Sequence, residues 1–165
     1  MNESLLLDFQ KSCVSNSTTT HFYENDLEQL IHYVTIGKSD VGIAVINDAE
    51  FPSLQSVLNT NGLNMNIIDE NVIYVHIGPQ HHLYNQDTIY FSDLLSSTYL
   101  HLPFDKFSHN RLDMQFGTHT LKEFQKSLTV NNYKLLPYIL QTTDSFLLGN
   151  KWQIDYLSQF DVKSF

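Results

Sequence analysis

Histidine is the residue that most readily suggests chemistry in this 165-residue chain, because the sequence contains eight of them. Imidazole nitrogens bind transition metals when several of them converge on one point. His81 and His82 are adjacent, which suits a single metal ion poorly unless the loop bends sharply. His109 and His119 are ten residues apart and would not share one face of a helix. We therefore interpret the histidines as surface residues or satisfied core residues, and we predict no metal site.

Motifs of enzyme chemistry are missing from the sequence. It contains no glycine-rich phosphate loop, no HExxH motif and no GxSxG motif. Cys13 is the single cysteine, so the usual thiolate zinc sites and an internal disulfide are excluded, and we interpret this residue as a small packing side chain. We predict no catalytic residues, no cofactor and no enzymatic activity. An enzyme that depends on His81 or Asp144 is the alternative.

Amide, carboxylate and hydroxyl side chains stand at the ends of predicted strands. Asn25 and Asp26 follow one predicted strand, and Asn47 follows the next. Ligands of open α/β sheets bind outside the carboxyl ends of the strands. Asn25 and Asp26 are also expected to cap a helix, so ligand contact would be an additional role. Thr142 and Thr143 precede another strand, where they either supply hydroxyls to a cleft or simply form a turn.

The elements that position the first of these residues form a strand, a helix and a second strand. Residues 18–23 are β-branched and aromatic, which favours a strand. The helix then presents one apolar face and ends near Gly37; the face consists of Leu27, Leu30, Ile31 and Val34. Residues 41–46 are almost entirely apolar, which predicts a strand covered on both faces of a parallel sheet. Such a unit is right-handed in nearly all proteins.

The rest of the chain continues to alternate between helices and strands. The pattern changes near Gly78, and the later strand at residues 145–148 returns the chain, which predicts two lobes with a cleft between them. Strands are predicted at residues 63–68, 72–77, 98–103, 127–130 and 145–148. Helices are predicted within residues 48–62 and 89–97 and at residues 111–126, 133–141 and 152–160. Residues 161–165 resemble the beginning of another strand.

Composition excludes some partners. The chain carries 18 acidic and 9 basic residues, a formal charge of −9, and its basic residues are scattered. A nucleic-acid surface needs clustered positive charge, so we expect no DNA or RNA binding by this chain alone. No apolar run approaches the roughly 20 residues of a membrane helix. The first residues lack a basic leader, so we predict no signal peptide, no membrane partner and a cytoplasmic location.

Three segments together resemble a known family. They are IGKSDVGIAVI (36–46), ENVIYVHIGPQHHLYNQDTIYFSDLLSSTYLHLP (70–103) and SLTVNNYKLLPYILQTTDSFLLGN (127–150). Their order and spacing resemble the effector-binding domain of LysR-type transcriptional regulators, over about residues 5–160. His82 departs from the family pattern, because the family usually has proline there.

The resemblance implies a two-lobed, periplasmic-binding-protein-like (type 2) α/β fold with mixed, mainly parallel sheets. Residues 1–70 and 150–165 would form the first lobe, and residues 71–149 the second. The first lobe would be incomplete, because we find no counterpart of its first strand or of its closing strand and helix. The winged helix-turn-helix domain of the family also has no counterpart in the chain.

The function implied by the resemblance is ligand sensing without catalysis. A small effector, an organic acid or an amino acid, would bind between the lobes of a homodimer or tetramer. DNA would be contacted only through the helix-turn-helix domain. A cytoplasmic solute-binding protein or a dimerisation module without a sensing role are the alternatives. By position, the effector-binding residues would be Asn25, Asp26, Asn47, Pro103, Phe104, Thr142 and Thr143.

Overall fold

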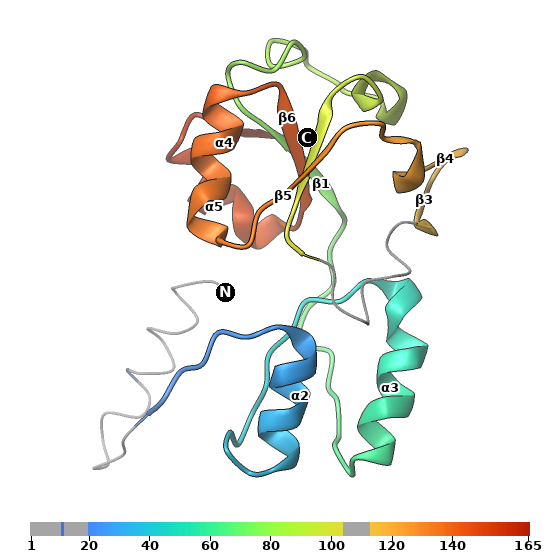
Figure 1. Cartoon of the computed structure of the whole chain (residues 1–165), viewed down its shortest axis with the longest axis vertical. Helices are drawn as coiled ribbons and strands as arrows, with labels where there is room; N and C mark the ends of the chain where they lie inside the picture. Colours follow the sequence, from blue (N-terminus) through green and yellow to red (C-terminus); the bar gives the residue numbers. More distant parts are fainter. Residues whose placement is uncertain (1–10, 12–19, 104–112) are drawn as a thin grey trace.

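A computed structural model describes residues 11, 20–103 and 113–165 of the chain. These residues form two parts, which are separated along the long axis of the molecule in Figure 1. The helical lobe, residues 20–70, contains the helices α2 and α3. The sheet lobe consists of the described residues from 71 onward and contains a five-stranded sheet.

The sheet has the strand order β5-β2-β6-β1-β7. Strand β2 pairs in parallel with β5 and with β6, whereas β1 pairs antiparallel with β6 and with β7. Four strands therefore run in one direction and β1 runs in the other, which confirms the predicted mixed, mainly parallel sheet. The strand bounds are Tyr74–Ile77 (β1), Thr98–His101 (β2), Ser127–Thr129 (β5), Ser145–Gly149 (β6) and Lys163–Ser164 (β7).

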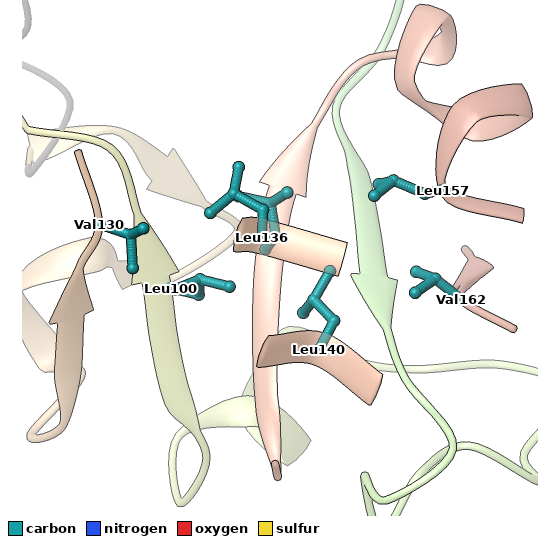
Figure 2. Packing of buried hydrophobic residues seen from close by; sticks show 7 residues of the cluster. Leu100, Val130, Leu136, Leu140, Leu157 and Val162 are labelled. Carbon is teal, nitrogen blue, oxygen red and sulfur yellow. The ribbon is translucent and has the colours of Figure 1, made fainter. Parts of the chain in front are cut away.

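One face of the sheet is covered by the helices α4 (Leu136–Thr142) and α5 (Ile154–Ser158). Leu100 and Leu147 pair in register on β2 and β6 and belong to the core on this face. Figure 2 shows Leu136 and Leu140 of α4 beside Leu100. Burial of each leucine side chain contributes about 1.5–3 kcal/mol, so this apolar cluster holds the helices on the sheet.

The opposite face of the sheet is aromatic. Side chains alternate between the faces of a strand, so Tyr99 projects away from the leucine core. Its ring lies 5.5 Å from the ring of Phe146 and 5.7 Å from the ring of Phe124. The short 3₁₀ helices η2 (Phe91–Leu94) and η4 (Leu121–Glu123) contribute buried Leu94 and Leu121 to the same core.

The last segment of the chain belongs to the sheet lobe. After η6 (Lys151–Gln153) and α5, strand β7 pairs with β1, and Val75 and Phe165 exchange two backbone hydrogen bonds of 3.0 Å. Leu157 and Val162 pack in the leucine core. The assignment of residues 150–165 to the first lobe is therefore wrong. The sequence pattern indicated a helix and a strand, but it did not indicate which sheet the strand would join.

The helical lobe contains α2 (Leu27–Thr35), the 3₁₀ helix η1 (Asp48–Glu50) and α3 (Phe51–Thr60). The backbone N–H of Gln29 donates to Asp26 Oδ1 at 2.8 Å, so Asp26 is the N-cap of α2. Gly37 follows the helix with a φ of 71°, as expected for a C-terminal glycine. Both helices occur where the sequence predicts them, and they pack around Ile31 and Leu54.

The strands predicted in the helical lobe are not formed among the described residues. Residues 20–23, 41–46 and 63–68 have no strand assignment, and residues 18 and 19 lie outside the described residues. Residues 41–45 are all exposed, although Gly42 lies close to α2: a Cβ at this position would be 2.4 Å from Leu30 Cδ2. Val41, Ile43 and Val45 are exposed, and Val41 is 74% exposed. The prediction of a strand covered on both faces is therefore wrong.

The helix predicted at residues 111–126 is also wrong. Residues 111 and 112 lie outside the described residues, and the following residues form a hairpin of β3 (Gln115–Phe116) and β4 (His119–Thr120). Gly117 has a φ of 65°, a left-handed conformation that suits a tight turn and interrupts a helix. The ring of Phe116 stacks on Phe91 at 4.6 Å, so its apolar side chain is buried by the hairpin instead of by a helix.

The helix predicted at residues 133–141 is confirmed as η5 (Tyr133–Leu135) followed by α4. Pro137 lies in the first turn of α4, where a missing N–H removes no helical hydrogen bond. In the described ranges, none of the helices combines the length and the apolar composition that a membrane span requires.

Candidate functional site

The carboxyl ends of three neighbouring strands meet at one edge of the sheet. Strands β2, β5 and β6 are parallel, so His101, Thr129 and Gly149 end them on the same side. In Figure 1 this edge faces the helical lobe. It is the edge at which open α/β sheets bind ligands.

The predicted site residues from the sheet lobe do not come together. Pro103 follows β2 at the carboxyl edge and is exposed, and Phe104 lies outside the described residues. Thr142 and Thr143 precede β6, and the register of Thr98 with Ser145 places them at the opposite edge of the sheet.

The hydroxyls of these two threonines are used within α4. Thr142 Oγ1 donates to the carbonyl of Tyr138 at 2.8 Å, and Thr143 Oγ1 donates to the carbonyl of Ile139 at 2.7 Å. The two residues terminate the helix, so a single site with Pro103 is not formed. These hydrogen bonds favour the alternative in which the segment simply forms a turn.

Asn25, Asp26 and Asn47 lie at helix starts in the helical lobe. Asn25 and Asp26 are exposed before α2, and Asn47 is half-buried before η1. The backbone N–H of Asn47 donates to Glu50 Oε2 at 3.2 Å, and Glu50 is buried. In Figure 1 both α2 and α3 begin at the end of the lobe that faces the sheet. Asn25 and Asp26 thus precede a helix that begins on the side of the helical lobe facing the sheet, and Asn47 precedes η1, which leads into α3.

A cavity of about 440 Å³ opens beside the carboxyl edge, on the aromatic face of β2 and β5. Alternate residues of each strand share a face, so β2 and β5 each contribute two neighbouring side chains. Strand β5 is at the edge of the sheet, which leaves the cavity open on that side. The lining residues are Tyr99, His101, Leu121, Lys122, Phe124, Ser127 and Thr129.

His101 has a fixed orientation in this cavity. The side chain is 9% exposed, and its Nδ1 lies 2.8 Å from the carbonyl oxygen of Leu102. A carbonyl oxygen can only accept, so Nδ1 carries a hydrogen. Nε2 lies 3.3 Å from Thr129 Oγ1 on the neighbouring strand. The backbone N–H of Val130 also donates to the carbonyl of His101 at 2.9 Å, which joins the two strand ends firmly.

Lys122 provides positive charge at the cavity. Its ammonium forms an ion pair with the carboxylate of Asp113, and both side chains are more than half exposed. Exposed ion pairs are weak and screened by salt, so the ammonium remains able to exchange partners.

This group of residues was not predicted from the sequence. The signal that was present is the i, i+2 spacing of Tyr99 with His101 and of Ser127 with Thr129 on two predicted strands. The pairing of β2 with β5 could not be read from either segment alone.

Two other buried histidines, His76 and His81, do not line this cavity. His76 Nδ1 is 2.8 Å from Ser164 Oγ, and burial lowers the pKa of His76 to about 4. Burial also lowers the pKa of His81 to about 4; His82 lowers it further, whereas Asp144 opposes the shift. Within the part of the chain that the structure describes, no three His, Cys, Asp or Glu residues are arranged to hold a metal ion.

Comparison with known proteins gives the fold. No protein-family model matches the chain, and no curated protein matches it. The effector-binding domain of QuiR in complex with shikimate is similar in structure, with a TM-score of 0.67 and 16% identity. The match covers 99% of this chain and 72% of that domain. The chain has the fold of a LysR-type effector-binding domain.

This likeness confirms the predicted fold class, a periplasmic-binding-protein-like α/β fold. A full-length BenM mutant also matches, with a TM-score of 0.47 and 12% identity, over 98% of this chain and 62% of that protein.

Proposed function

We propose that this chain is a ligand-sensing regulatory domain of the LysR type without catalysis of its own. The observation that supports the proposal most strongly is the likeness to the QuiR effector-binding domain across 99% of the chain, because that domain is in complex with shikimate. A DNA-binding domain outside this sequence would transmit the signal. We infer a homodimeric or tetrameric regulator located in the cytoplasm, with the boundary between its lobes near residue 70.

The effector would bind between the two lobes, at the carboxyl edge of the sheet. Asn25, Asp26 and Asn47 would contact it from the helical lobe, and Pro103 would contact it from the sheet lobe. The first turns of α2 and α3 carry backbone N–H groups without helical partners and a partial positive charge. Such helix starts hold carboxylates well. A small organic acid or an amino acid therefore suits this position.

Sensing would follow from the two-lobed shape. An effector that contacts both lobes binds the closed arrangement more tightly than the open one, so it shifts the population toward closure. The shift is limited by the difference between the two affinities. Closure would then change how the regulator's subunits are arranged on DNA.

Thermal unfolding with a panel of organic acids and amino acids tests the proposal, with shikimate as the first compound. Binding to the native state should raise the melting temperature in proportion to the logarithm of the ligand concentration once it exceeds Kd. Asn47→Ala should reduce this rise, whereas the exposed control Asn85→Ala should leave it unchanged. If no compound raises the melting temperature at millimolar concentration, the proposal is wrong.

A further inference from the structure

We propose that the cavity between β2, β5 and η4 is a separate binding site for a small aromatic hydroxy acid. The site goes beyond the proposed function, because all of its described lining residues belong to the sheet lobe and binding there needs no closure of the lobes. Its chemistry follows from three features: an aromatic wall, an oriented hydroxyl and an exchangeable ammonium.

The aromatic wall is rigid and apolar. Tyr99 and Leu121 are almost fully buried, and the Phe124 ring lies 5.7 Å from the Tyr99 ring and 4.9 Å from the Phe146 ring. Because Tyr99 and Leu121 are buried, the half-buried Phe124 ring is the part of the wall that a further ring can contact, in a stacked or edge-on geometry. A volume of about 440 Å³ lies within the range of small-molecule sites and accommodates one substituted ring.

Thr129 presents an oriented oxygen to the cavity. The hydrogen of His101 Nδ1 is directed to the carbonyl of Leu102, so in the neutral ring Nε2 can only accept. The hydroxyl of Thr129, 3.3 Å away, therefore donates its hydrogen to Nε2. Its lone pairs remain to accept a hydrogen bond from a ligand. Ser127 adds a second hydroxyl on the same side of β5. The site thus favours a ligand that carries a hydroxyl donor.

Lys122 favours a ligand that places a negative charge at the rim of the cavity. Its ammonium is held by the carboxylate of Asp113 on the neighbouring segment, and both groups are solvent-exposed. A ligand carboxylate can share or replace that partner. Asp113 also repels the ligand carboxylate, so we expect the ammonium to contribute only a few-fold to affinity.

Calorimetric titration of the full chain with 3-hydroxybenzoate and with benzoate tests the assignment. The two probes differ only in one hydroxyl group, which would donate a hydrogen bond to Thr129. Thr129→Val should weaken 3-hydroxybenzoate binding about ten-fold and change benzoate binding less than two-fold. Thr118→Val, an exposed turn residue outside the cavity, is the matched control and should change neither. Lys122→Met should weaken both probes two- to five-fold.

Three results would overturn the assignment: no binding of 3-hydroxybenzoate at millimolar concentration, equal losses for the two probes in Thr129→Val, or the same loss in Thr118→Val. Circular dichroism and thermal unfolding of each variant show that it is folded, and Lys122→Met tests the site independently of β5. Asn47→Ala should leave 3-hydroxybenzoate binding unchanged. If that variant abolishes binding instead, the probe occupies the inter-lobe position, and the cavity is not the site. Failure here leaves the shikimate thermal shift unaffected, so the two proposals fail separately.

Discussion

His101 Nε2 and Thr129 Oγ1 lie 3.3 Å apart across two parallel strands. The contact joins the carboxyl end of β2 to the carboxyl end of β5, the edge strand of the sheet. It fixes the tautomer of the histidine and the direction of the threonine hydroxyl at the same time, because Nδ1 is committed to the Leu102 carbonyl. The polar lining of the cavity is therefore organised before any ligand arrives.

Removing this contact should cost stability as well as binding. Thr129→Val keeps the shape of the side chain but leaves His101 Nε2 without its hydroxyl partner, so we expect a loss of about 1 kcal/mol in the free energy of unfolding. Urea denaturation measures it. Thr118→Val should change the free energy by less than about 0.5 kcal/mol. Equal stability of the Thr129→Val variant and the wild type would show that the hydrogen bond is absent in solution.

The two buried histidines predict a loss of stability in mild acid. Each has a folded-state pKa of about 4, against 6.5 for an ordinary histidine. Well above pH 6.5 the two histidines are neutral in the folded and in the unfolded state, so they do not lower the free energy of unfolding. As the pH falls from 6.5 to 4, the unfolded state binds protons that the folded state does not, so stability decreases, by on the order of 3 kcal/mol for His76 and by less for His81, beside which Asp144 favours the protonated ring.

Urea denaturation at pH 7.5, 6 and 5 measures this decrease. His76→Leu should flatten the dependence on pH, because it removes one of the two groups, whereas the exposed control His21→Gln should preserve it. A wild-type free energy of unfolding that is equal at pH 7.5 and pH 5 contradicts the burial of these imidazoles.

In the helical lobe, substitution of a buried side chain should lower the free energy of unfolding, whereas substitution of an exposed side chain should not. Leu54 is buried against Ile31, so Leu54→Ala should cost about 2–5 kcal/mol. Val41 is exposed, and Val41→Thr should change the free energy by less than about 0.5 kcal/mol. Hydrogen exchange of α2 and α3 reports on this lobe directly. A cost above 1 kcal/mol for Val41→Thr would mean that this side chain is covered in solution.

Gly78 tests how closely the loop after β1 approaches α4. A Cβ at this position would lie 1.9 Å from the carbonyl oxygen of Leu140, which is backbone and cannot rotate away. Gly78→Ala should therefore lower the free energy of unfolding by more than 3 kcal/mol, at the severe end of single substitutions. Gly62→Ala, which meets no atom but has a φ of 69°, should cost only about 1–3 kcal/mol. Similar, small losses for both variants in thermal denaturation would contradict the close approach.

Much of the sheet lobe could be predicted from the sequence, because its strands are short apolar segments with clear turns between them. The cap at Asp26 and the glycine at position 37 likewise fixed the bounds of α2 through local chemistry. Local signals fail where pairing is non-local. Residues 161–165 resemble the beginning of a strand in the sequence, but only the structure pairs residues 163–164 with β1.

The candidate site shows the same division between local and non-local information. Pro103 was predicted as a site residue because it follows a strand, and the structure places it at the carboxyl edge. Thr142 and Thr143 were also predicted as site residues, but they end a helix at the opposite edge. His101 and Thr129 are 28 positions apart in the sequence, and their contact depends on the order of strands in the sheet. Residues 41–46 were apolar enough for a buried strand, yet burial also requires a second covering layer.

Hydrogen exchange with and without ligand tests directly whether an effector binds between the two lobes. The ligand should be the panel compound that raises the melting temperature most, at saturating concentration. We expect slower exchange in both lobes at once, at the starts of α2 and α3 and in the residues that follow β2. Protection that is confined to one lobe, or absent from both, would contradict it.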